Sequence, residues 1–220
     1  MSNGTFPKLL TEIDELTLPQ HSYLTAEDKC YFFGEYTARA GYAAGPTNDL
    51  IHNFKKGTDR KGKAEWKYKE RSISEAAAAL SKALNPKFLE KATLVPMPPS
   101  KGKGDPRYDD RLVRMLRQMD GADKLDIREV LLQTATREAA AHDGQRLGPD
   151  ELGKLYVVDK GLVAPAPSAI GIFDDLLVTG ASFVAAKRVL AAQFPNAKIY
   201  GIFLARRALP DPEQFFDIEF

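Results

Sequence analysis

The sequence is poor in cysteine and has almost no net charge. Its 220 residues include one cysteine, Cys30, and three histidines, so an internal disulfide is excluded and no Cys/His cluster indicates zinc. The 31 basic and 30 acidic residues nearly cancel, which gives no general attraction to nucleic acid or to a membrane. No apolar run approaches a membrane span, and the N-terminus lacks a signal-peptide pattern. We therefore expect a reduced, cytoplasmic setting, without membrane or nucleic-acid partners.

The residues that are present suit one globular domain with a sizeable core, since 44% are hydrophobic and 28% are charged. Alternating strand and helix signals after residue 91 predict an α/β fold whose mainly parallel sheet is flanked by helices. The strands are expected at 92–95, 126–133, 155–158, 170–173 and 197–205, and the main core helices at 111–119 and 184–192. Residues 1–90 are expected to form a helical segment packed on the core, with helices at 6–16, 25–41, 48–56 and 67–84.

The most informative stretch begins with the apolar run Ile170–Phe173, which is typical of a short buried strand. Two adjacent carboxylates, Asp174 and Asp175, follow it, and after three apolar residues comes the small-residue turn Thr179–Ser182. A strongly helical segment, 184–192, comes next.

This order has a chemical meaning. The first N–H groups of a helix lack intrahelical partners and carry partial positive charge, so a Gly/Ser/Thr turn before a helix suits a phosphate. Carboxylates at the carboxyl end of the preceding strand are good acceptors for sugar hydroxyls. The stretch therefore predicts a site for a sugar phosphate, although an ordinary strand and helix joined by a Gly/Ser-rich turn is the alternative.

Residues 172–182 resemble the ribose-phosphate-binding signature of the type I phosphoribosyltransferases, in which two acidic residues, two apolar residues and a Thr/Gly-rich loop follow a hydrophobic strand. Gly171 departs from the bulky aliphatic residue that this family prefers. The resemblance implies that Asp174 and Asp175 hold the ribose hydroxyls, favour charge at the anomeric carbon and bind Mg²⁺ directly or through water. It also implies a 5′-phosphate site made of Val178, Thr179, Gly180, Ala181 and Ser182.

A second site follows the strand at 92–95, where Val95-Pro96-Met97-Pro98 is similar to the Val-Pro-x-Pro loop of the ComF-type, competence-associated branch of the family. That resemblance implies a loop around the diphosphate, because the loop offers backbone N–H groups and cations. The residues concerned are Met97, Pro98, Pro99, Ser100 and Lys101, with Arg107 or Arg111 as the arginine. A proline-rich surface connection with solubilising lysines is the alternative.

The polar segment 134–154 lies where family members carry a mobile hood, and His142 and Arg146 are its loosely matching residues. An ordinary surface helix and loop is the alternative. Arg206, after the last strand, is expected to contact diphosphate or acceptor, with a plain surface role as the alternative.

The resemblance at these sites implies a phosphoribosyltransferase that binds phosphoribosyl diphosphate and Mg²⁺. Such an enzyme transfers the phosphoribosyl group to an acceptor, unidentified here, and releases diphosphate. A non-catalytic module that binds phosphoribosyl diphosphate or a nucleotide is the alternative function. DNA handling rests on family association alone, and the near-neutral charge argues against it. The oligomeric state stays open, a homodimer included.

Overall fold

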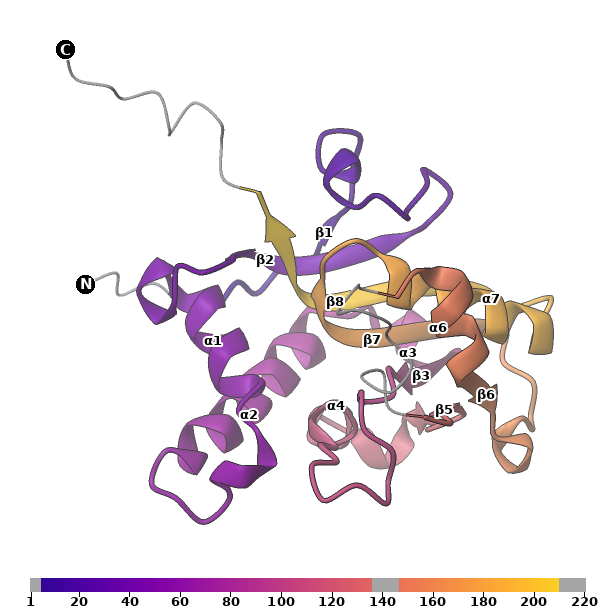
Figure 1. Cartoon of the computed structure of the whole chain (residues 1–220). Coiled ribbons are helices and arrows are strands. Elements are labelled where there is room, and N and C mark those ends of the chain that lie inside the picture. Colours follow the sequence, from indigo (N-terminus) through magenta and orange to yellow (C-terminus); the bar gives the residue numbers. More distant parts are fainter. Residues whose placement is uncertain (1–4, 136–146, 210–220) are drawn as a thin grey trace.

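A computed structural model describes residues 5–135 and 147–209, and within them six strands form a central sheet (Figure 1). Their order is β1-β2-β8-β7-β3-β4, and every neighbouring pair is parallel except β1 and β2. The strands are β1 (Thr11–Glu12), β2 (Cys30–Thr37), β3 (Ala92–Pro96), β4 (Asp126–Ile127), β7 (Ala169–Leu177) and β8 (Lys198–Ala208). A separate antiparallel pair joins β5 (Leu131–Gln133) to β6 (Tyr156–Val158). The predicted α/β class with a mainly parallel sheet is confirmed.

The helices cover both faces of this sheet. They are α1 (Pro46–Phe54), α2 (Trp66–Ala83), α3 (Pro86–Leu89), α4 (Arg111–Arg117), α6 (Pro149–Leu155) and α7 (Ala181–Gln193). Crossover connections between parallel strands are right-handed, so connections that run in opposite directions along the sheet place their helices on opposite faces. Accordingly α1, α2 and α4 lie together, and α6 packs on α7 at the other face (Figure 1).

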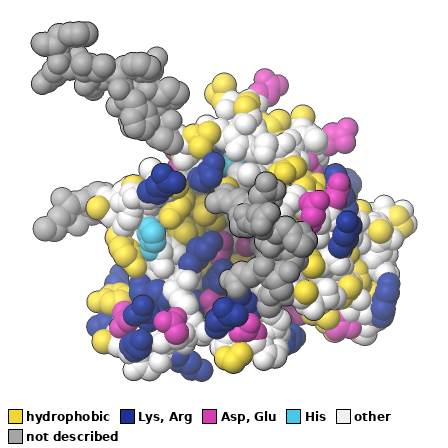
Figure 2. All heavy atoms as spheres, viewed as in Figure 1, with side chains coloured by type: hydrophobic (Ala, Val, Ile, Leu, Met, Phe, Trp, Pro, Cys, Tyr) yellow, Lys and Arg dark blue, Asp and Glu magenta, His cyan; other side chains and the backbone are white. Residues whose placement is uncertain are grey.

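The core is formed where the central strands are covered on both sides. All five residues of β3 are buried, and Ile170, Ile172 and Phe173 of β7 have no exposed surface. In such strands a continuous apolar run replaces the alternation of a half-exposed strand. On the surface, basic, acidic and hydrophobic side chains are interspersed over the face drawn in Figure 2, as the balanced composition predicts.

Packing explains the glycine that departs from the family signature. A Cβ atom on Gly171 would lie 3.0 Å from Phe173 Cε2 and 3.2 Å from both Ile202 Cδ1 and Phe88 Cζ. A bulky aliphatic side chain would require these neighbours to move, because protein interiors are closely packed. The space that such a residue would fill is taken by these neighbouring side chains.

The helix predicted at 25–41 is wrong, because the structure has strand β2 there. The segment Cys30–Thr37 is rich in aromatic residues, which favour strands, and it lies between β1 and the central strand β8. Phe32 and Phe33 are adjacent and both buried, which a strand achieves by placing them on opposite faces. The predicted helix at 6–16 is also wrong: Thr11–Glu12 forms β1. Residues 1–90 are thus not a purely helical segment.

Other predicted boundaries also change. The single strand expected at 126–133 is two short strands in different sheets, separated by residues 128–130. In this connection the Arg128 side chain donates to the carbonyl oxygens of Leu162 and Pro165. Strand β7 continues through both carboxylates instead of ending at them. Arg206 lies within β8 rather than after it. The helices predicted at 67–84, 111–119 and 184–192 and the strands at 92–95 and 197–205 are confirmed within a few residues.

Candidate functional site

The candidate site lies where the chain changes direction across the sheet. Strand β3 connects through α4 to β4 on one side, and β7 connects through α7 to β8 on the other. The two loops that leave the carboxyl ends of β3 and β7 therefore diverge and open a crevice between them. Open α/β sheets bind ligands at such switch points. A cavity of about 680 Å³ lies here, a volume typical of small-molecule sites.

One wall of the cavity is the small-residue turn, Val178–Ser182, which leads from β7 into α7. Gly180 adopts a left-handed conformation with φ of 86° and caps the helix. A Cβ atom added to Gly180 would lie 2.7 Å from both Cγ and Cδ2 of Leu24. Both the backbone angle and the close contact require glycine. The hydroxyl of Thr179 accepts a hydrogen bond from Ala181 N–H at 3.4 Å.

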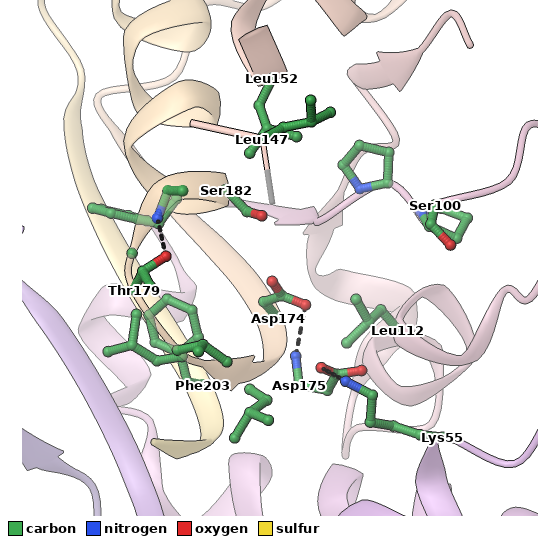
Figure 3. A pocket seen from close by; sticks show the side chains of 18 of the residues that line it. Lys55, Ser100, Leu112, Leu147, Leu152, Asp174, Asp175, Thr179, Ser182 and Phe203 are labelled. Atoms are coloured by element: carbon green, nitrogen blue, oxygen red, sulfur yellow. Dashed lines mark hydrogen bonds and ion pairs between the residues drawn. The ribbon is translucent and has the colours of Figure 1, made fainter. Parts of the chain in front are cut away.

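The two carboxylates of β7 point to different places, as successive strand residues do. Asp174 points into the space between Ser182 and Ser100, whereas Asp175 points toward Lys55 (Figure 3). The carboxylate Oδ1 of Asp174 also accepts the backbone N–H of Asp175 at 2.8 Å. The pair therefore does not offer two equivalent carboxylates to a ligand.

Asp175 is 4% exposed and is held by two cations. Lys55 Nζ lies 3.1 Å from its Oδ1, and Arg111 donates to its Oδ2 from Nη2 at 2.7 Å and from Nε at 3.1 Å. Burial raises the pKa of Asp175, but the positive charges of Arg111 and Lys55 lower it more, so the net pKa lies well below its ordinary value. Asp175 is an ionised anchor for these two cations.

This ion pair belongs to a larger charged cluster under the cavity. Asp109 accepts from Arg111 Nη1 at 2.7 Å and from Lys69 Nζ at 2.8 Å. The fully buried Lys69 also donates to the carbonyl oxygens of Phe54 and Lys56, each at 2.8 Å. All three ammonium donors of Lys69 are thus satisfied, as a buried charge requires. The cluster fixes the end of α1, and with it Lys55, against α2, α4 and β7.

The loop after β3 supplies part of the expected set. Pro98, Pro99 and Ser100 line the main cavity. Met97 and Lys101 are buried and instead line a smaller neighbouring cavity of about 240 Å³.

The arginines predicted to bind the ligand lie in different places. Arg111 lines the main cavity, whereas Arg107 bonds to Asp105 and lines neither cavity. The buried Arg206 donates to Gln20 and Glu35, with its guanidinium 5.3 Å from the centre of the Phe32 ring, and it does not line the main cavity. His142 and Arg146 lie outside the described residues.

Several cavity residues were missed from the sequence. Lys55 stands in a basic, glycine-punctuated segment that is typical of an exposed loop, and no local signal distinguishes it from its lysine neighbours. Asp109 is also charged, and the others are apolar: Leu112, Leu147, Leu152, Leu176, Leu177, Phe183 and Phe203. Leu147 and Leu152 lie above Ser182, on the side of the cavity facing α6 (Figure 3).

A magnesium ion fits the site in part. Within residues 5–135 and 147–209, no group of three or more His, Cys, Asp or Glu side chains could hold a metal ion. Both oxygens of Asp175 accept from cations, which makes it a poor metal ligand. Mg²⁺ is commonly held by one or two carboxylates together with phosphate oxygens and water. Asp174 is placed to be such a carboxylate.

In the described part of the chain, no helix is both long and apolar enough to cross a bilayer. In comparisons with known proteins, no family model matches the chain, and no curated protein matches its sequence.

Proposed function

We propose that this chain is a phosphoribosyltransferase of the type I class, which binds phosphoribosyl diphosphate with Mg²⁺ and transfers the phosphoribosyl group to an acceptor. One observation carries the proposal. A single cavity at the switch point of the sheet joins the small-residue turn, the Asp174 carboxylate and the cations Lys55 and Arg111. A ligand with a phosphate at one end, hydroxyls in the middle and further negative charge at the other end matches this order.

The 5′-phosphate would bind at the small-residue turn, because the first turn of α7 and the hydroxyls of Thr179 and Ser182 provide donors there. Asp174 would accept from the ribose hydroxyls. The diphosphate would lie toward Pro98–Ser100 and Lys55, which is across Asp174 from Thr179 (Figure 3).

The residues of the chain would act through position and charge. Bound Mg²⁺, held by Asp174 and ligand oxygens, would supply neutralising charge to the diphosphate. Lys55 would approach the diphosphate as well. Asp175 would still be paired with Arg111 if Lys55 turned toward a ligand. Asp174 would stabilise positive charge at the anomeric carbon, and the apolar side chains Leu112, Leu147 and Leu152 would limit access of water.

The test is the single substitution Asp174→Asn, with binding of phosphoribosyl diphosphate and Mg²⁺ measured by calorimetry and diphosphate release measured with a panel of bases. We expect affinity to fall by about tenfold or more, since a hydrogen bond to a charged group contributes about 1.5–3 kcal/mol. The rate of diphosphate release should fall by a larger factor than the affinity does. Asp175 is unsuitable for this test, because replacing it breaks a buried ion pair and would change stability as well.

The matched control is Asp59→Asn, on an exposed carboxylate that does not line the cavity. It should bind like the wild type. The proposal fails if Asp174→Asn binds and releases as well as the wild type while its melting temperature is unchanged.

One observation favours the alternative, a module that binds the same ligand without catalysis. Both oxygens of Asp175 are engaged in ion pairs, so of the acidic pair Asp174 alone is placed to face the reacting carbon. A site that binds the ligand without catalysis does not need the second carboxylate. Tight binding by the wild type without diphosphate release, with every base tested, would support the binding module over the enzyme.

A further inference from the structure

We propose that residues 21–24 position the small-residue turn from outside the cavity, with His21 as the positioning residue. The inference rests on the proposed function, because it assigns these residues a role in phosphate binding. His21 is fully buried, and its Nδ1 lies 2.6 Å from the carbonyl oxygen of Val178. The N–H of Tyr23 donates to the carbonyl oxygen of Thr179 at 2.9 Å. Leu24 packs directly on Gly180.

These contacts determine where the turn directs its donors. A trans peptide group is planar, so its N–H points opposite to its C=O. The carbonyl groups of Val178 and Thr179 point toward residues 21–24. The N–H groups in the same two peptides, those of Thr179 and Gly180, must therefore point away from that segment. Thr179 and Gly180 line the cavity, whereas residues 21–24 do not, so these N–H groups lie on the side where an anion would bind.

The chemistry of His21 suits a fixed donor. A carbonyl oxygen only accepts, so Nδ1 must carry the proton in this contact. Among the described residues Nε2 is buried and has no hydrogen-bond partner. A proton on Nε2 would thus be buried without an acceptor, which favours the neutral ring with Nδ1–H. The backbone that carries this ring is also held in place: Leu24 N–H donates to the His21 carbonyl at 2.8 Å and closes a tight turn.

The test compares three substitutions that differ in where they place a donor. His21→Asn puts an amide nitrogen near the position of Nδ1, His21→Gln puts one near Nε2, and His21→Ala has none. Amide hydrogen exchange of residues 178–182 is measured without ligand, and affinities for ribose 5-phosphate and for diphosphate are measured by calorimetry. We expect Ala and Gln to speed exchange in the turn and to weaken ribose 5-phosphate binding by about tenfold, the effect of losing one hydrogen bond.

His21→Asn should restore slow exchange and most of the affinity for ribose 5-phosphate, and all three variants should bind diphosphate like the wild type. A merely structural role would affect Asn and Gln alike, and that result would overturn the inference, as would unchanged exchange in the turn. If His21→Ala does not fold, the comparison of Asn with Gln remains. The proposed function fails separately, if the wild type binds no phosphoribosyl diphosphate, and the exchange result stands in that case.

Discussion

At the scale of single residues, Asp174 and Asp175 show how little the sequence says about the roles of neighbours. The resemblance gives both the same task, but strand alternation sends them to different surroundings. Asp175 meets Lys55 and Arg111, which come from segments 120 and 64 residues away in the chain. No local pattern around Asp175 contains this information, because it depends on how α1 and α4 pack against β7.

His21 gives a prediction for the dependence of stability on pH. Burial lowers its pKa below the ordinary 6.5, the contact with Val178 opposes this, and the charges of Arg206 and Arg207 lower it further. The unfolded chain therefore takes up a proton before the folded protein does. The free energy of unfolding should fall as the pH drops below about 6.5, by at most about 1.4 kcal/mol per pH unit from this group.

Urea unfolding between pH 7.5 and 5.5 checks this. The comparison is His21→Asn, which has no group that titrates in this range and should show a flatter profile than the wild type. Equal slopes for the two proteins would contradict the assignment of a buried neutral ring.

At the scale of elements, the connection from β7 to α7 depends on Gly180 for two separate reasons, its positive φ and its contact with Leu24. Gly121 has a similar φ of 69°, but nothing lies within 4 Å of a Cβ placed there. The chain thus contains a matched pair of glycines that separates backbone strain from steric overlap.

We expect Gly121→Ala to lower the free energy of unfolding by about 1–2 kcal/mol, the cost of a left-handed conformation for alanine. Gly180→Ala should cost about 1–3 kcal/mol more, because Leu24 has to move in a closely packed region. Only Gly180→Ala should weaken binding of phosphoribosyl diphosphate, since it disturbs the turn. Denaturant unfolding and calorimetry measure the two effects, and equal losses of stability would show that the contact with Leu24 is unimportant.

At the scale of the whole molecule, the N-terminal third is part of the sheet. Strand β2 pairs with β8 in parallel, from Cys30 opposite Gly201 to Thr37 opposite Ala208. Residues 21–24 contact the small-residue turn, and Lys55 reaches Asp175. The boundary expected near residue 90 therefore divides the sequence but not the central sheet or the candidate site.

A fragment of residues 91–220 is expected not to fold alone, because it would lack β2 and would leave apolar surface of β8 exposed at a sheet edge. Near-ultraviolet circular dichroism and the dispersion of amide signals in an NMR spectrum are the measurements. Adding residues 1–90 as a separate chain should restore the native signals. A fragment with native-like spectra by itself would show that the core is independent of the N-terminal third.

The sequence alone determined the α/β class, the small-residue turn before a helix and the acidic pair beside it. These features could be predicted because apolar runs, helix propensity and turn chemistry are local properties of neighbouring residues. It misassigned β2 as a helix, since aromatic residues at 31, 32 and 36 fit either interpretation until a neighbouring strand is known.

Only the tertiary structure decided that both carboxylates line the cavity while Asp175 is held by Lys55 and Arg111. It also decided that Lys55 lines the same cavity and that His21 contacts the carbonyl oxygen of Val178 behind it. The physical reason is that these roles follow from ion pairs and hydrogen bonds between residues far apart in the chain, and such contacts exist only after the sheet and its helices have come together.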